Sequence, residues 1–223
     1  MREFSQNHMI LILQGLGWTV ALTLAAMIFG GILGLLVAVL RSSPNRWVSL
    51  PSAVLIRLFQ GIPLVVVIFM IYFGIARTGY NVSPFVACAV GLSLFAAAFL
   101  GEIWRGALLA IPRAQWESAD SLGMTSFQML RIAILPQALR LSAPATVGFL
   151  VQLVKATSVC SMVGFVELMR AGQMVNGTTF DSFRVFGIVA ALYLLINLPM
   201  SFAAKRLEKL LSLIHISEPT RPY

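Results

Sequence analysis

Few side chains in this 223-residue chain could handle a solute, and the most suggestive is a lysine inside an apolar segment. Lys155 is the single charge between residues 141 and 163, and Thr157 and Ser158 follow it. A charge at membrane depth is costly and tends to face a cavity. There an ammonium suits a carboxylate, provided that further hydrogen bonds, such as those of the two hydroxyls, support the pair. We therefore take these three residues as candidates for a translocation path. The alternative is that the lysine snorkels to the outer interface.

A break in another apolar segment offers a second candidate for this path. The segment from about Ser52 to Ala76 is interrupted by Gln60-Gly61-Ile62-Pro63, and proline removes a helix hydrogen bond and clashes with the preceding turn. Broken membrane helices gather around transport sites, where protein or water satisfies the freed backbone groups. Gly61 and Pro63 are therefore also candidate pathway residues.

The polar stretch Glu102–Leu139 predicts two short helices around a glycine turn. Ala114–Leu122 contains good helix formers, and Gly123 can adopt the left-handed conformation that ends a helix. Thr125 or Ser126 can then cap the second helix.

This second helix is expected to run to Pro136, with Phe127, Leu130 and Ile134 on one face at a spacing of three to four residues. A helix-turn-helix with an apolar face is typical of a docking element. The alternative is an amphipathic helix that lies on lipid headgroups.

The composition indicates an integral membrane protein. Hydrophobic residues make up 59% of the chain and charged residues 11%, whereas soluble domains carry roughly 25% charged residues; the mean hydropathy is +0.89. So much apolar surface must face lipid. The few charges exclude a disordered chain. Two cysteines, Cys88 and Cys160, in apolar stretches do not make a disulfide scaffold. The net charge of +8 is better explained by basic loops than by a nucleic-acid partner.

Apolar segments predict an all-α, polytopic protein with about five membrane spans. The first is uncharged over 26 residues, which exceeds the roughly 30 Å hydrocarbon core when helical. Gly30 and Gly34 in it form a small-xxx-small face suited to helix packing. The expected spans are Gly15–Leu40, Ser52–Ala76, Pro84–Gly101, Leu141–Val163 and Phe183–Ala204.

Basic residues orient these spans, because arginine and lysine are enriched in cytoplasmic loops. One side has more of them than the other, which places the amino terminus outside and the polar stretch in the cytoplasm. The richer side carries Arg41, Arg46, Arg105, Arg113, Arg131, Arg140, Lys205, Arg206 and Lys209, and the poorer side carries Arg2, Arg77, Lys155, Arg170 and Arg184.

The polar stretch resembles the EAA loop of bacterial ABC-importer permeases. That pattern is Glu-Ala-Ala, three residues, Gly, nine residues, Ile, one residue and Leu-Pro. The chain departs from it at Ser118, which replaces the middle alanine, and at Ala133, which replaces the isoleucine. The matching residues are Glu117, Ala119, Gly123, Leu135 and Pro136.

Further segments resemble the polar amino-acid branch of this family, and the likeness covers about Leu13 to Leu210. One departure is Gln60, where the family usually carries arginine. The segments include Gln60-Gly-Ile-Pro-Leu64, Gly101-Glu-Ile-Trp-Arg-Gly106, Val154-Lys-Ala-Thr-Ser158 and Gly164-Phe-Val-Glu-Leu168.

The resemblance implies a type I ABC-importer permease fold with a permease domain over residues 1–210 and a cytoplasmic EAA coupling loop at about 114–136. It implies transport of polar amino acids across the bacterial inner membrane. The implied partners are an ATP-binding cassette ATPase dimer that receives the loop, an extracytoplasmic solute-binding protein, a second identical or homologous permease chain, and the lipid bilayer. Glu117 would face ATPase groups, and Gly123 would set the angle between the loop helices.

No catalytic motif is present in the sequence. It lacks a Gly-x4-Gly-Lys-Ser/Thr phosphate loop, so ATP must be hydrolysed by a separate protein. It also lacks HExxH, GxSxG and any metal-ligand cluster, and we expect no catalytic residue, metal or cofactor. The alternative is a channel or secondary carrier working without ATP. A carrier would be expected to show internal repeats and carboxylates at mid-membrane.

The last residues, 211–223, break the pattern of the rest. They read Leu-Ser-Leu-Ile-His-Ile-Ser-Glu-Pro-Thr-Arg-Pro-Tyr, with two prolines and no continued amphipathic period. They resemble an in-frame translation of a transposase sequencing adapter. We expect this segment to be foreign to the protein; the alternative is a natural disordered tail.

Overall fold

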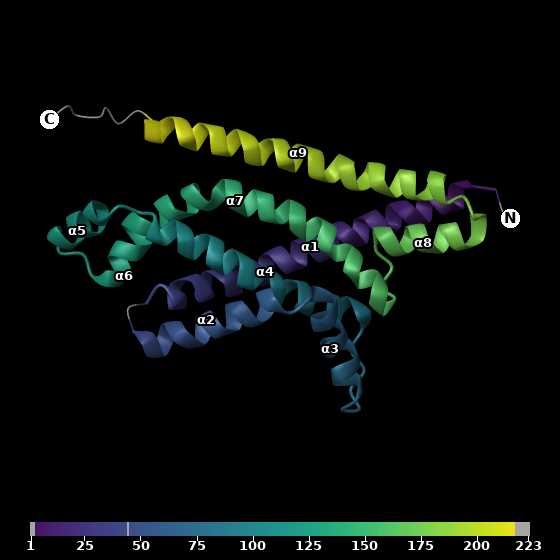
Figure 1. Cartoon of the computed structure of the whole chain (residues 1–223), viewed down its shortest axis with the longest axis horizontal. Helices are drawn as coiled ribbons and strands as arrows, with labels where there is room; N and C mark the ends of the chain where they lie inside the picture. The colour runs from purple at the N-terminus through teal and green to yellow at the C-terminus, as the bar shows by residue number, and fades with distance from the viewer. Residues whose placement is uncertain (1–2, 44, 217–223) are drawn as a thin grey trace.

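The computed structural model describes residues 3–43 and 45–216, which form helices and no strand (Figure 1). Four helices are long and apolar enough to cross a membrane, or five if one bent pair counts as a single span. The all-α, polytopic prediction is confirmed. In chain order the elements are α1 (Gln6–Arg41), α2 (Arg46–Gly61), α3 (Leu64–Ala76), α4 (Pro84–Leu109), α5 (Arg113–Ser121), α6 (Ser126–Gln128), the π-helix η1 (Met129–Ile134), α7 (Leu135–Ala156), the 3₁₀-helix η2 (Thr157–Val163), α8 (Leu168–Thr179) and α9 (Ser182–Ile216).

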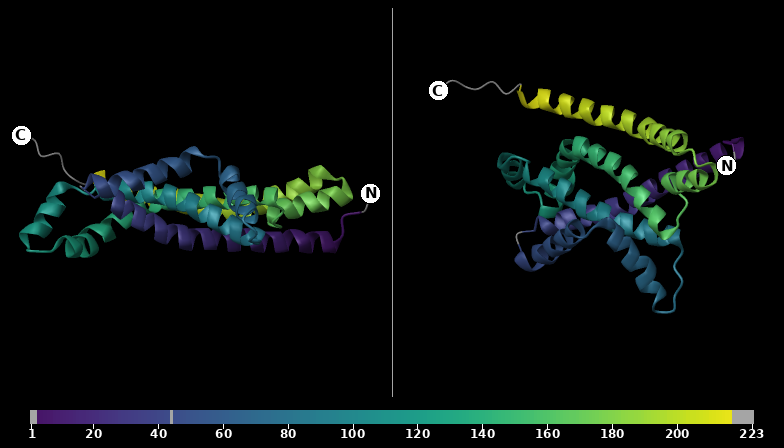
Figure 2. Two further views of the ribbon diagram at one scale, coloured as in Figure 1. Left: turned by 90° about the horizontal axis from the view of Figure 1, so that it is seen from below. Right: turned by 45° about the vertical axis from the view of Figure 1, so that its right-hand side comes forward.

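The helices form an elongated bundle with two different ends. Helix α4 packs on α1, α2, α3 and α7, and α9 packs on α7 and α8. Helices α5 and α6 lie at one end with the carboxyl-terminal end of α9, and the start of α1 lies with α8 at the other end (Figures 1 and 2). The polar stretch and the amino terminus are therefore on opposite sides of the bundle.

Small residues bring α1 and α4 into close contact. A Cβ atom added at Gly30 would lie 2.6 Å from the Ala96 Cβ, and one added at Gly34 would lie 3.1 Å from the Leu100 Cβ. Membrane helices lack a hydrophobic driving force between them, so close van der Waals packing holds them together. The predicted role of the two glycines in helix packing is confirmed.

The predicted break in the second span is confirmed as a bend. Helices α2 and α3 meet at 99°, with Pro63 as the N-cap of α3. The Gln60 amide donates to the Ala98 carbonyl of α4 at 3.4 Å and so ties the bend to the bundle. Helix α2 also begins earlier than predicted, at Arg46.

Two other sequence-based boundaries were wrong. Helix α4 continues past Gly101 to Leu109, and Glu102 and Arg105, one turn apart on this extension, form an ion pair. The stretch 164–182, expected to be a loop, contains α8. Helix α8 has 12 residues, too few to cross a membrane, so the pattern of apolar spans did not predict it.

The expectation that residues 211–223 are foreign stays a prediction. Helix α9 continues to Ile216, and residues 217–223 lie outside the described residues.

The close packing of α1 on α4 generates a stability prediction. Gly30→Ala should lower the thermal unfolding midpoint of the detergent-solubilised protein, because the added methyl would also lie 2.7 Å from the Ser93 carbonyl oxygen and overpacking costs about 1–3 kcal/mol. Gly31→Ala is the matched control, since its methyl would meet only the Trp104 ring at 3.7 Å. Equal midpoints for the two variants would contradict the proposed packing.

Candidate functional site

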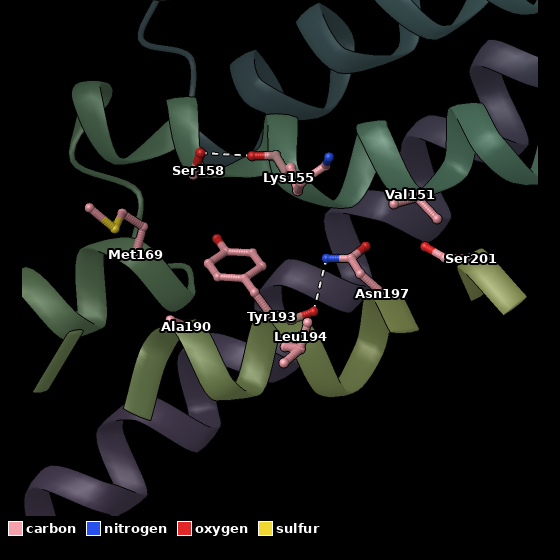
Figure 3. A pocket seen from close by; sticks show the side chains of 9 residues that line it. All are labelled: Val151, Lys155, Ser158, Met169, Ala190, Tyr193, Leu194, Asn197 and Ser201. Carbon is pink, nitrogen blue, oxygen red and sulfur yellow. Dashed lines mark hydrogen bonds between the residues drawn. The ribbon is translucent and has the colours of Figure 1, made fainter. Parts of the chain in front are cut away.

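A cleft of about 530 Å³ lies between α7, α8 and α9 (Figure 3). Both of its long walls carry polar residues, one wall from α7 and the start of η2, the other from α9. The lining residues are Val151, Lys155, Ser158, Met169, Ala190, Tyr193, Leu194, Asn197 and Ser201.

The α7 wall presents a cation. Lys155 is in the last turn of α7, where carbonyl dipoles favour positive charge. Its side chain is exposed, and within the described part of the chain its ammonium has no hydrogen bond or ion pair. The Ser158 hydroxyl donates to the Lys155 carbonyl at 2.7 Å, so it must turn from this carbonyl before it can donate to a ligand. This wall can bind an anionic group through the Lys155 charge, with the Ser158 hydroxyl beside it.

The structure does not bring all five candidate pathway residues together. Thr157 is completely buried and donates to the Val154 carbonyl at 2.8 Å, so it faces the core instead of the cleft. Residues three apart share a face where the helix tightens to 3₁₀ geometry, which places Ser158 beside Lys155. Gly61 and Pro63 are exposed at the bend between α2 and α3 and do not line the cleft.

Sequence reasoning missed the polar groups of the α9 wall. Asn197 is only 9% exposed. Its amide nitrogen donates to the Tyr193 carbonyl at 2.9 Å, while its side-chain oxygen is buried without a partner. An unsatisfied buried acceptor costs free energy that a ligand donor would recover. The signal in the sequence was the pair of polar residues four apart in an otherwise apolar span.

A buried carboxylate at the edge of the cleft was also missed. Glu167 caps the start of α8 and is 0% exposed. The hydroxyl of Tyr193, a cleft residue, donates to it at 3.0 Å. Its position just before a short helix was the available signal. Among the described residues, no group of three or more histidines, cysteines, aspartates and glutamates could hold a metal ion.

The helix-turn-helix predicted in the polar stretch is present as α5 and α6. Gly123 has φ of +72°, the left-handed conformation expected at the turn. The Thr125 hydroxyl accepts from the Gln128 N–H, and the Gln128 side chain in turn accepts from the Thr125 N–H. This reciprocal capping fixes the start of the second helix.

The prediction that this helix ends at Pro136 is wrong. Chain 126–163 is one continuous helical segment, in which η1 joins α6 to α7. The Leu135 N–H donates to the Leu130 carbonyl five residues back. Pro136 then occupies the first turn of α7, where its missing N–H is tolerated. The polar stretch is thus joined rigidly to the span that carries Lys155.

The loop residues divide into anchors and exposed groups. Ala119 and Ile134 are buried, and Ile134 packs with Leu108 of α4. Of the apolar face predicted for the second helix, Phe127 is 68% exposed and Ile134 is buried. The matched residues Glu117, Gly123 and Pro136 are exposed, and Leu135 is half-buried.

Comparisons with known proteins agree with this architecture. Residues 30–213 match the family described as "Binding-protein-dependent transport system inner membrane component". The chain is 32% identical to the probable amino-acid ABC transporter permease protein YckA of Bacillus subtilis, over 82% of this chain and 80% of that protein. It is 33% identical to the putative glutamine transport system permease protein GlnP of Rickettsia felis, over 90% of this chain and 92% of that protein.

Two solved structures have the same fold. An amino acid ABC transporter crystallised with histidines superposes with a TM-score of 0.82 at 29% identity, covering 93% of this chain and 99% of that one. An inward-facing MetNI methionine ABC transporter superposes with a TM-score of 0.79 at 27% identity, covering 91% and 97%.

Proposed function

Because the chain belongs to the binding-protein-dependent transport system inner membrane component family, it is a membrane-spanning permease subunit of an ABC importer, and we propose that it carries polar amino acids. The observation that supports this substrate class is the cleft with its unpaired Lys155 ammonium on one wall and the unpaired Asn197 acceptor on the other. An α-amino acid offers a carboxylate to the first and an ammonium to the second. Its relatives include permeases named for glutamine and for arginine.

In this proposal Lys155 and Ser158 bind the carboxylate of the solute. The ion pair is favourable only if further hydrogen bonds support it. The Ser158 hydroxyl on the same wall would supply one by turning from the Lys155 carbonyl to the solute carboxylate. Thr157 supports the wall from the core side. Gly61 and Pro63 remain proposed pathway residues at the α2–α3 bend, outside this cleft. If the snorkelling alternative holds instead, Lys155 contacts only the interface.

The coupling loop, residues 114–136, is proposed to dock on a separate ATPase that hydrolyses ATP. Its exposed apolar groups, Leu122 at 76% and Phe127 at 68%, suit a groove on such a partner, with the exposed Glu117 as the nearby charge. Ala119 is buried, and Leu135 and Ile134 pack with Leu108 of α4. ATP-driven movement would therefore be transmitted to the spans as a rigid-body shift.

We further propose the assembly and orientation of the importer. One coupling loop in each chain fits a pair of permease chains on an ATPase dimer. Helix α9 carries exposed Leu194, Leu195, Leu198 and Phe202 that can face lipid or a second permease chain. In the bacterial inner membrane the loop would be cytoplasmic, and the amino terminus would be outside, on the side of a solute-binding protein.

The coupling role predicts that Glu117→Lys and Gly123→Pro abolish ATP-driven uptake while the chain still inserts. Proline cannot adopt the positive φ of Gly123, and the lysine reverses an exposed charge. Uptake of L-glutamine and L-arginine in reconstituted vesicles measures this. Glu208→Lys, an equal charge change on exposed α9, is the control. Wild-type uptake by either well-expressed loop variant would show that the loop does not couple.

The cleft predicts that Lys155→Met lowers uptake by about tenfold or more, because a charge-assisted contact with the carboxylate is lost. The assay uses vesicles with saturating binding protein, and co-purification of the ATPase verifies assembly. Lys205→Met, the same change at an exposed position of α9, should transport normally. Normal uptake by Lys155→Met would leave only the snorkelling role.

The assembly predicts two permease chains for each pair of ATPases. Native mass spectrometry of the purified complex in nanodiscs measures the ratio. A complex with a single permease chain that still transports would refute the paired arrangement.

A further inference from the structure

Within the described residues, Glu167 is the one carboxylate that is completely buried. One of its oxygens accepts from the Arg170 N–H at 2.8 Å, and the other accepts from the Met169 N–H at 2.9 Å. The second oxygen also accepts from the Tyr193 hydroxyl at 3.0 Å. All three partners are donors, which is the pattern that an ionised carboxylate requires.

The surroundings hold this carboxylate in place. Burial raises the pKa of the Glu167 carboxyl, and its hydrogen bonds from the α8 backbone and from Tyr193 act in the opposite direction. The next residue, Leu168, donates its N–H to the Thr19 hydroxyl of α1 at 3.1 Å. A Cβ added at Gly15 would lie 2.9 Å from the Glu167 carbonyl oxygen, so α1 packs directly on this corner. These contacts fix the backbone at Glu167, and the two α8 N–H groups hold its carboxylate beside Tyr193.

The hydrogen bond from Tyr193 to Glu167 determines whether the Tyr193 hydroxyl can donate or accept in the cleft. Its only hydroxyl proton is directed to Glu167, so its oxygen can offer only lone pairs to a ligand. Asn197 also offers an acceptor: one of its two amide N–H groups donates to the Tyr193 carbonyl, and its buried side-chain oxygen is unpaired. The side chains of Tyr193 and Asn197 project from α9 toward the wall with Lys155 and Ser158 (Figure 3). The cleft therefore has a cationic wall and an acceptor wall.

We infer that Glu167 is a positioning residue for recognition of the solute's ammonium group: by taking the Tyr193 proton it keeps the α9 wall an acceptor surface. Glu167 does not touch the solute and acts through Tyr193. The inference rests on the proposed function, since it assumes that an amino acid enters this cleft with its carboxylate at Lys155.

Glutamine at this position would reverse the polarity of the contact. The single amide oxygen cannot serve both carboxylate positions, because the Arg170 N–H uses one oxygen while the Met169 N–H and the Tyr193 hydroxyl share the other. With the amide oxygen toward Arg170, the NH₂ faces Tyr193. The hydroxyl would accept from this NH₂ and turn its own proton into the cleft, against an incoming ammonium. Glu167→Gln should therefore weaken recognition of the ammonium, although it barely changes side-chain volume.

The test measures binding to the purified permease–ATPase complex without binding protein. The probes are L-glutamine against glutaramate, which lacks the α-ammonium, and L-arginine against 5-guanidinovalerate, which lacks it too. Wild type should prefer the amino acid by about tenfold or more. In Glu167→Gln and in Tyr193→Phe, the ratio of the affinity for the amino acid to the affinity for its analogue should fall toward one. The double variant should have the same ratio as Tyr193→Phe alone, because Glu167 acts only through Tyr193.

The control is Asp181→Asn, the same chemical change at a carboxylate that caps α9 outside the cleft; it should keep the wild-type preference. An unchanged preference in Glu167→Gln, or additive losses in the double variant, would overturn the inference. If Glu167→Gln fails to assemble, Tyr193→Phe decides by itself, and an unchanged preference in it overturns the inference.

The proposed function fails in a different way. A wild-type complex that binds neither amino acid, or a Lys155→Met complex that binds both as tightly as wild type, would contradict the substrate proposal itself. A Lys155→Met complex that loses binding, together with an unchanged preference in Glu167→Gln, would remove only the role of Glu167.

Discussion

The bundle is organised around the close approach of α1 to α4 and α8. In lipid, apolar side chains gain little by leaving their surroundings for each other, so helices associate where their backbones can come near. Gly30 and Gly34 allow this against α4, and Gly15 allows it against the Glu167–Ala171 turn of α8. One long helix thereby fixes the centre of the bundle and the corner that holds the cleft.

Helix α7 connects the two places where function is proposed. It begins where η1 ends the coupling loop, and its last turn holds Lys155. Its 22 residues span about 33 Å at the usual rise of an α-helix. Ile134, just before α7, is buried against α4. A displacement of the coupling loop would therefore be transmitted to the cleft through α7 and through α4, on which Ile134 packs.

The cleft is where polar groups are left without partners. Elsewhere in the bundle, buried hydroxyls donate to backbone carbonyls of their own helix, as at Thr23 and Thr157, which satisfies them without any ligand. In the cleft, the Lys155 ammonium and the Asn197 oxygen lack such partners among the described residues. The Tyr193 hydroxyl donates its proton to Glu167. Among the described residues, the Asn197 oxygen is the one buried side-chain polar atom without a hydrogen-bond partner, and Asn197 lines the cleft together with Lys155.

Sequence alone determined the features that depend on local chemistry. Composition placed the chain in a membrane, the proline at position 63 located the bend, and Gly123 with Thr125 defined the turn of the coupling loop. Each follows from the conformational limits of one residue or from exposure to lipid. Local reasoning failed at Pro136, because a proline that ends one helix is equally acceptable in the first turn of the next.

Only the tertiary structure decided which side chains share the cleft. Thr157 and Ser158 are neighbours in sequence, yet one is buried in the core and the other lines the cleft, because the packing of η2 selects the face. Glu167 and Tyr193 are 26 residues apart, and Leu168 bonds to Thr19 across 149 residues. Such contacts depend on how distant helices dock, and apolar spans of similar composition carry no local signal of which faces will meet.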